Sequence, residues 1–382
     1  MKRRAPALPR RRLPSLVGAA LVLAARLAPS VATAGGGFPD PDWEIANPAD
    51  IGMDPIALDE ARDYALTGNG SGMVIHEGKL VASWGDLETP YDLLSTTKSI
   101  GSLLVGLAIG DGLFALDDSA LTYYPEFGVP PDENTATGWL PGITVRHLAT
   151  HAAGFDVPGG FSPLLRAPGT AWLYSDCGAQ WLGDLLTVRF ADDLANVLRT
   201  RVCATIGVPD TELLWRDNAY RPPDLNGHAR RELASGISAS VDAMARLGYL
   251  CLRDGRWNGV QVIASSYVSA MRHPDPSIAS LPNEDARCPG ATSHYGLLWW
   301  TNGDGSLAGV PTDAYFSWGL LDSVILVIPS LDLVAVRAGD GWRPDWNADY
   351  GVMAPFAGPL ARSVLVSAVD RPSWGRLHAA FR

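Results

Sequence analysis

The chain has 382 residues, a formal net charge of −11, 47% hydrophobic residues and 19% charged residues. This length and balance indicate a globular protein with a sizeable core and exclude a disordered chain. The acidic balance argues against partners that carry negative charge, so we expect no nucleic-acid partner and no binding to an anionic lipid surface.

The first 34 residues have the layout of an export signal. Basic residues fill the stretch before Leu13, an apolar run extends from there to Ala25, and small residues end the segment at Ala34. The run is too short to span a membrane. We therefore expect a signal peptide over 1–34, an exported mature chain that is periplasmic or secreted, and no stable membrane insertion after cleavage. An uncleaved anchor is the alternative, and paired arginines permit twin-arginine export without establishing it.

The mature chain, residues 35–382, shows strand patterns near its two ends and helix patterns between them. A helix is expected at 55–66, followed by a hairpin of strands at 73–76 and 80–84. Further helices are expected at 145–151, 177–188, 192–202 and 241–252. Later strands are expected at 295–301, 314–318, 324–328 and 333–337, and a last helix at 352–369.

This order of elements predicts a single α/β (α+β) domain. One antiparallel sheet would be built from both ends of the chain and flanked by helices. We expect this sheet lobe to take up about 48–95 and 290–382, and an inserted helical lobe about 100–288. The active site would lie in the seam between the lobes.

Ser95-Thr96-Thr97-Lys98 is the stretch that best fits a catalytic centre. Ser95 stands before an apolar stretch with helical spacing, so Lys98 lies one turn further along the same face. A serine hydroxyl needs a base to become a nucleophile, and lysine can be that base whereas arginine cannot. The chain holds only three lysines, at positions 2, 79 and 98, which makes a lysine at this spacing more telling. A solvated lysine near a helix start is the alternative.

A second stretch, Pro168-Gly169-Thr170 followed by Tyr174-Ser175-Asp176, predicts a turn and then the start of an apolar helix. A tyrosine there can relay protons if a nearby cation lowers its pKa. Taken alone, a tyrosine before a helix is more simply explained by core packing.

Together these stretches resemble the serine β-lactamase and penicillin-binding protein family, and more closely its esterase-like branch, which includes 6-aminohexanoate-oligomer hydrolases. Stretches similar to the family's appear in its order over most of the mature chain, at 91–99, 116–118, 144–154, 168–176, 236–240, 295–300 and 327–334. The resemblance implies a β-lactamase/transpeptidase-like fold and an acyl-enzyme on Ser95, with Lys98 and Tyr174 sharing the proton transfers. It also implies an oxyanion hole formed by the N–H groups of Ser95 and Leu320.

Two positions depart from the family pattern. Asp176 replaces an asparagine if Tyr174-Ser175-Asp176 is the second motif; if Ser175-Asp176-Cys177 is that motif, a cysteine replaces the asparagine. Ser317-Trp318-Gly319 matches the third motif without its usual lysine or histidine, the cation that holds a carboxylate of a β-lactam or peptide. We therefore expect Asp176, Trp318 and Gly319 to contact substrate. Trp172, Trp299 and Trp300 join Trp318 as candidates for an apolar acyl pocket, with core packing as the alternative.

The function expected from these motifs is hydrolysis of a small ester or neutral amide. A D,D-peptidase or β-lactamase and a non-catalytic binding member of the family are the alternatives. No cofactor and no metal are expected, because His147 and His151 lack the glutamate of the zinc-protease motif. The four cysteines, Cys177, Cys203, Cys251 and Cys288, allow either two disulfides or buried free thiols. The oligomeric state and the acyl and leaving groups stay open.

Overall fold

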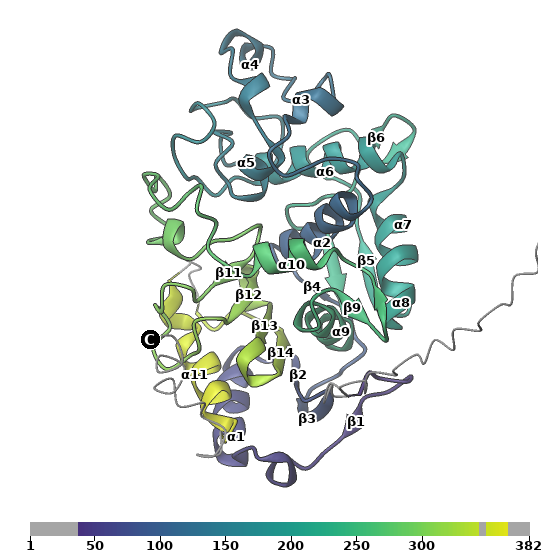
Figure 1. Ribbon diagram of the computed structural model, residues 1–382, viewed down its shortest axis with the longest axis vertical. Helices are drawn as coiled ribbons and strands as arrows, with labels where there is room; N and C mark the ends of the chain where they lie inside the picture. The colour runs from purple at the N-terminus through teal and green to yellow at the C-terminus, as the bar shows by residue number, and fades with distance from the viewer. Residues whose placement is uncertain (1–36, 344–348, 366–382) are drawn as a thin grey trace, which may run out of the picture. The chain divides into compact units, whose positions relative to one another are not determined.

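The computed structural model describes residues 37–343 and 349–365, and its frame is a seven-stranded sheet (Figure 1). The strands lie in the order β1-β3-β2-β14-β13-β12-β11. They span Glu44–Ile45 (β1), Ser71–His76 (β2), Lys79–Trp84 (β3), Trp300–Thr301 (β11), Tyr315–Trp318 (β12), Val324–Ile328 (β13) and Leu333–Ala338 (β14). All neighbours are antiparallel except β1 and β3, which are parallel. The expected sheet, built from both ends of the chain, is confirmed.

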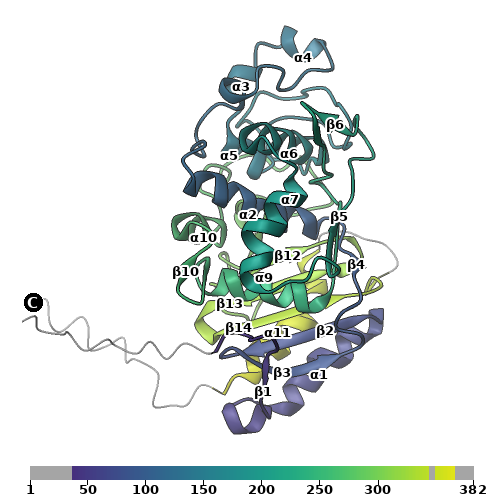
Figure 2. The same ribbon diagram turned by 90° about the vertical axis from the view of Figure 1, so that its right-hand side faces the viewer.

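Helices cover both faces of this sheet. The central strands are apolar on both sides because both of their faces are buried. Ile325 of β13 belongs to one hydrophobic core together with α9 (Val241–Leu252). Its neighbour Leu326 belongs to a second core with α1 (Pro55–Ala65) and α11 (Ala354–Ser363). Successive side chains of a strand point to opposite faces, so the two cores lie on the two sides of the sheet. Figure 2 shows α9 on one side and α1 with α11 on the other.

The segment between the two groups of sheet strands is mostly helical, with short strand pairs that the sequence patterns did not predict. Its helices are α2 (Thr96–Gly110), α3 (Ala120–Tyr123), α4 (Glu133–Ala136), α5 (Val145–Ala149), α6 (Asp176–Phe190), α7 (Leu194–Leu198), α8 (Ala204–Ile206) and α10 (Ser265–Met271). Its strands are β4 (Tyr91–Asp92), β5 (Leu213–Trp215), β6 (Asp224–Leu225), β7 (His228–Ala229), β8 (Ile237–Ala239), β9 (Arg256–Trp257) and β10 (Val260–Gln261). Short 3-10 helical turns span Pro48–Ile51 (η1), Leu66–Gly68 (η2), Leu140–Gly142 (η3), Ala291–Ser293 (η5), Leu320–Asp322 (η6), Pro329–Leu331 (η7) and Tyr350–Val352 (η8), and Arg199–Cys203 (η4) is a π-helical turn.

One helix from the middle of the chain packs against the seven-stranded sheet. The helix expected at 241–252 is α9, and it packs against β13 and β14. Gly248 permits the close approach, because a Cβ there would lie 2.7 Å from Val334 Cγ1 and 2.8 Å from Ile325 Cγ2. The chain therefore returns to the sheet once before its last strands, which the linear pattern did not show.

Several expected boundaries differ from the structure. The strand expected at 295–301 is reduced to β11, because Leu298 has a φ of 61° and interrupts the extended backbone. The expected signal peptide, residues 1–34, and the end of the expected last helix, residues 366–369, lie outside the described residues. No helix within the described ranges is long and apolar enough to cross a membrane.

Candidate active site

Ser95 lies at the junction between a short strand and a buried helix. β4 ends at Asp92, Leu94 takes up a left-handed φ of 49°, and α2 begins at Thr96. Asp92 supports the turn by accepting a hydrogen bond from the Leu94 N–H at 3.1 Å. A serine at this position commonly caps the helix, yet the Ser95 side chain makes no capping bond. Its hydroxyl is therefore free for other chemistry.

Lys98 occupies the next turn of α2 and points at that hydroxyl. Its side chain is only 1% exposed, and its Nζ lies 3.0 Å from Ser95 Oγ and 2.8 Å from the Ala234 carbonyl oxygen. Nζ also forms an ion pair with Asp176 Oδ1 at 2.6 Å. Three oxygens thus hold one buried amine, a geometry suited to an ammonium group.

Charge around Lys98 decides the protonation state of the site. Burial lowers the pKa of Lys98, but the negative charge of Asp176 and the neighbouring Tyr174 oppose burial, and the net pKa is raised. Lys98 is therefore protonated at neutral pH in the resting protein. It can act as a base only after it gives up that proton.

Tyr174 forms the wall of the site beside Lys98. Its ring centroid lies 4.8 Å from Lys98 Nζ, and the ring packs between His151, at 4.3 Å between centroids, and Trp300, at 6.3 Å. Burial raises the pKa of Tyr174, while the Lys98 charge and a hydrogen bond with Ser95 act in the opposite direction. The phenol is thus neutral at rest and touches both other members of the predicted catalytic group.

Asp176 is the first residue of α6, where a carboxylate is favoured by the helix dipole. Its side chain is 40% exposed although one oxygen pairs with buried Lys98. The sequence motifs assigned Asp176 to substrate binding. The structure gives it a direct contact with Lys98, and its side chain is still partly open to solvent.

The third motif lies at the end of β12, next to the start of α2. Ser317 Oγ accepts hydrogen bonds from Thr96 Oγ1 at 3.2 Å and from the Ile325 N–H at 2.8 Å. A Cβ on Gly319 would overlap the Leu93 carbonyl oxygen and would stand 3.0 Å from the Thr96 nitrogen. Only glycine lets this strand end come so close to the residues on either side of Ser95. At position 317 a buried serine thus joins β12 to α2 where the family pattern has a cation.

Leu320 follows directly after Gly319, in the turn η6. Its side chain is 42% exposed, and no described residue accepts a hydrogen bond from the N–H of Leu320 or of Ser95. Gly319, which precedes Leu320, closely approaches Thr96, which follows Ser95. The role of the two N–H groups as an oxyanion hole stays a prediction.

The four tryptophans proposed for an acyl pocket are all core residues. Trp172, Trp299, Trp300 and Trp318 are each at most 2% exposed. The indole N–H of Trp318 donates to Asp322 Oδ1 at 2.8 Å, so this ring is fixed within the core. Their placement matches the core-packing alternative, and Trp318 presents almost no surface to a substrate.

The sequence patterns did not predict two contacts of Lys98, those with Asp176 and with the Ala234 carbonyl oxygen, and they indicated His151 only as a candidate metal ligand. The Ala234 carbonyl oxygen has no sequence signal, because every residue carries a carbonyl group. His151 has a φ of 58° and accepts a hydrogen bond from the Ser175 N–H at 3.2 Å. Burial, followed by the charge of Lys98, holds the pKa of His151 well below its ordinary value, so the ring against Tyr174 is neutral.

No metal-binding group of three or more His, Cys, Asp or Glu side chains occurs in the part of the chain that the structure describes. His147 Nδ1 accepts a hydrogen bond from the Thr144 N–H at 3.2 Å, so His147 helps to cap α5. All four cysteines are buried free thiols, which decides between the two alternatives that the sequence left open.

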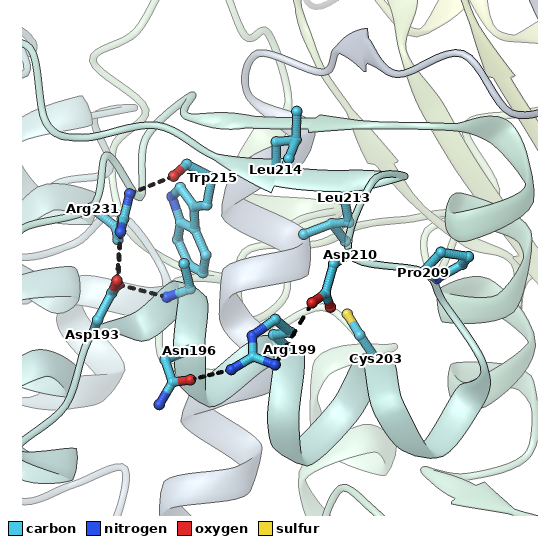
Figure 3. A pocket seen from close by; sticks show the side chains of 11 residues that line it. Asp193, Asn196, Arg199, Cys203, Pro209, Asp210, Leu213, Leu214, Trp215 and Arg231 are labelled. Atoms are coloured by element: carbon cyan, nitrogen blue, oxygen red, sulfur yellow. Dashed lines mark hydrogen bonds and ion pairs between the residues drawn. The ribbon is translucent and has the colours of Figure 1, made fainter.

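A cavity drawn in Figure 3 lies apart from these residues and is lined by residues of α7, η4 and β5. Its charged groups pair with one another: Arg231 with Asp193 at 2.5 Å and Arg199 with Asp210 at 3.8 Å. None of Ser95, Lys98 and Tyr174 lines it. We therefore place the candidate active site at the start of α2.

Comparisons with known proteins identify the family and the fold of the chain. The family model described as Beta-lactamase matches residues 68–354. A beta-lactamase from Escherichia coli is 29% identical over 209 residues, which cover 45% of this chain and 53% of that protein. A candidate 6-aminohexanoate-dimer hydrolase from Bacillus anthracis superposes with a TM-score of 0.60 at 16% identity, over 78% of this chain and 81% of that one. EstCE1, a hydrolase with promiscuous acyltransferase activity, superposes with a TM-score of 0.60 at 16% identity, over 82% of this chain and 99% of that one.

Proposed function

Since the chain belongs to the beta-lactamase family, we propose that it is an exported serine hydrolase that cleaves an ester or a neutral amide through an acyl-enzyme on Ser95. The observation that carries this proposal is the Lys98 nitrogen 3.0 Å from Ser95 Oγ. A buried lysine against a free serine hydroxyl at a helix start is the arrangement that acyl transfer needs.

In the proposed reaction, Lys98 first gives up its proton to solvent water. Neutral Lys98 then accepts the Ser95 proton while the serine oxygen bonds to the substrate carbonyl carbon. The N–H groups of Ser95 and Leu320 stabilise the negative oxygen of the tetrahedral intermediate. As the bond to the leaving group breaks, the proton passes through Lys98 and Tyr174 to the leaving oxygen or nitrogen.

Water completes the reaction by the same path. It adds to the acyl carbonyl while Lys98 and Tyr174 take one of its protons, and that proton returns to Ser95 as the acid leaves. Because Lys98 and Tyr174 are in contact, their titrations are coupled, and the pair rather than either residue sets the pH dependence.

Two observations favour esters and neutral amides over β-lactams and carboxylate-bearing peptides. Position 317 holds a buried serine in place of a cation, and Asp176 adds a partly exposed negative charge beside Lys98. A substrate carboxylate would gain no ion pair from Ser317 and would meet repulsion at Asp176.

The test is a substrate panel with a matched variant. Wild type and Ser95→Ala are assayed on p-nitrophenyl acetate, p-nitrophenyl butyrate, a D-alanyl-D-alanine peptide and nitrocefin. We expect ester hydrolysis by wild type only, and weak or absent turnover of the other two. Equal ester rates for the two proteins would refute the proposal, and efficient nitrocefin or peptide turnover would establish the β-lactamase or D,D-peptidase alternative.

Export is a separate part of the proposal. It is supported by the basic, apolar and small-residue segments of residues 1–34. Expression of the full chain in a bacterial host, followed by fractionation and mass determination, should give a periplasmic or secreted product that begins at Gly35. A full-length product that stays with the membrane would favour the uncleaved anchor.

A further inference from the structure

A buried arginine on β14 forms hydrogen bonds to the turn that contains Leu320. Arg337 is 0% exposed, and its Nη1 donates to the carbonyl oxygens of Leu321 at 2.6 Å and Asp322 at 3.1 Å. Its Nη2 donates to the carbonyl oxygens of Gly68, at 2.6 Å, and of Asp340. One guanidinium group thus connects η6 to two other turns. One of them precedes β2 and contains Gly68, and the other follows β14 and contains Asp340.

Asp322 fixes the same turn through its side chain. Oδ1 accepts the indole N–H of Trp318 at 2.8 Å, and Oδ2 accepts the backbone N–H of Trp342 at 2.8 Å. The carboxylate is buried, and its charge is the largest influence that opposes the burial of Arg337. Arg337 and Asp322 together hold η6 from inside the protein; we call them the Arg337–Asp322 anchor.

The turn would not keep this shape without outside support. Leu321 has a φ of 64° and Asp322 a φ of 55°, a backbone region that residues with a Cβ rarely occupy. Leu320 and Leu321 are 42% and 43% exposed, so their side chains add little burial to stabilise the turn. The hydrogen bonds from Arg337 to the Leu321 and Asp322 carbonyls are the contacts that offset this unfavourable conformation.

We propose that the Arg337–Asp322 anchor positions the Leu320 N–H for the oxyanion that forms when Ser95 attacks. The inference rests on the proposed function, since it assigns a task to that same site. Arg337 and Asp322 are positioning residues: they touch the turn through its carbonyl groups and the Trp318 indole, and they have no contact with Ser95, Lys98 or Tyr174 among their described hydrogen bonds.

The experiment compares Arg337→Met and Arg337→Lys with a control in the helical part of the chain, Arg230→Met. Arg230 is also buried and donates to Asp184 Oδ1 at 2.9 Å and to the Pro222 carbonyl oxygen at 2.6 Å, far along the chain from η6. Each variant is measured for kcat and KM on p-nitrophenyl butyrate, for Tm, and for inhibition by phenylboronic acid, which forms a tetrahedral adduct with a serine.

We expect Arg337→Met to lower kcat by about 10- to 100-fold, the effect of a misplaced catalytic donor, with little change in KM. Phenylboronic acid should bind more weakly in the same proportion, because its adduct places an oxygen where the oxyanion forms. Arg337→Lys should recover part of kcat, and Arg230→Met should lower Tm without lowering kcat.

A second variant covers the case in which Arg337→Met does not fold. Asp322→Asn keeps the size of the side chain but turns one of its two acceptor oxygens into a donor, so it should loosen the turn and lower kcat in the same selective way. Parent values of kcat and boronate affinity in folded Arg337→Met, or in Asp322→Asn where Arg337→Met does not fold, would overturn the inference while leaving the hydrolase assignment intact. Absence of ester hydrolysis in wild type would instead contradict the proposed function.

Discussion

At the residue scale, the site has a feature that its motifs alone do not convey: Lys98 is held as an ammonium. The Asp176 carboxylate that keeps Nζ in place at 2.6 Å also stabilises its charge. A lysine that must be neutral to accept the Ser95 proton is therefore active only in the fraction of molecules that has lost the proton. The asparagine that the family pattern has at position 176 would not impose this condition.

The ion pair between Lys98 and Asp176 predicts how the activity depends on pH. Because the pKa of Lys98 is raised, kcat/KM for an ester should rise with pH from neutral into the alkaline range. Asp176→Asn removes the largest influence that raises this pKa while burial, which lowers it, remains. The acid limb of the profile should then move to lower pH. An acid limb that stays in place or moves upward would contradict the assignment of Lys98 as the base.

Tyr174 gives a second prediction at this scale. Tyr174→Phe keeps the ring against His151 and removes only the hydroxyl group, so folding should be little affected. Loss of a proton relay should lower kcat by about 100-fold or more. Tyr64→Phe is the matched control, since Tyr64 donates to the Val352 carbonyl oxygen at 2.8 Å, away from the site. Equal kcat values in the two variants would remove Tyr174 from the mechanism.

At the scale of elements, the site depends on how closely the end of β12 meets the start of α2. Thr96 donates to the Ser323 carbonyl oxygen at 2.8 Å, and Ser323 Oγ donates to the Leu93 carbonyl oxygen at 2.6 Å. These bonds join two elements that lie more than 200 residues apart in the sequence. These hydrogen bonds can form because Gly319 has no side chain between the two elements.

Gly319→Ala should therefore separate these elements. The added Cβ would overlap the Leu93 carbonyl oxygen, and we expect a loss of stability of about 1–3 kcal/mol together with most of the activity. Gly110→Ala is the control in the same helix α2: its Cβ would meet only Ala264 Cβ, at 3.6 Å. Thermal unfolding and ester hydrolysis of both variants are the measurements, and parent behaviour of Gly319→Ala would show that the approach is not required.

At the scale of the whole molecule, the two cores on either side of the sheet bury the four free thiols. Cys177, Cys203, Cys251 and Cys288 are each at most 3% exposed. Burial raises the pKa of Cys203 and of Cys288 to about 12, which suppresses the reactive thiolate form.

Thiol titration checks this arrangement. Native protein should react with Ellman's reagent slowly or not at all, and four thiols should appear once guanidinium chloride unfolds it. Tm should be the same with and without a reductant. A drop in Tm on reduction, or fewer than four thiols in the unfolded chain, would mean that disulfides form after all.

Local patterns predicted the contact between Ser95 and Lys98 and the sheet strands apart from β1, because alternation, helical spacing and the Ser95-x-x-Lys98 motif are each local. They did not predict that α9 covers the sheet or that Asp176 pairs with Lys98. Both features depend on segments that are distant in the sequence. Gly248 lets α9 approach the sheet, and the start of α6 brings Asp176 to Lys98. The tryptophans failed as a pocket for the same reason, since composition does not tell a buried ring from one that lines a cleft.

The central claim is that Ser95 forms the acyl-enzyme, and the direct measurement is the mass of the trapped intermediate. Wild type and Ser95→Ala are mixed with p-nitrophenyl acetate, quenched in acid during turnover, and analysed intact and after digestion. We predict one added acetyl group in wild type, located on the peptide that contains Ser95, and none in Ser95→Ala. Acetylation at another residue, or turnover by Ser95→Ala at the parent rate, would contradict the account.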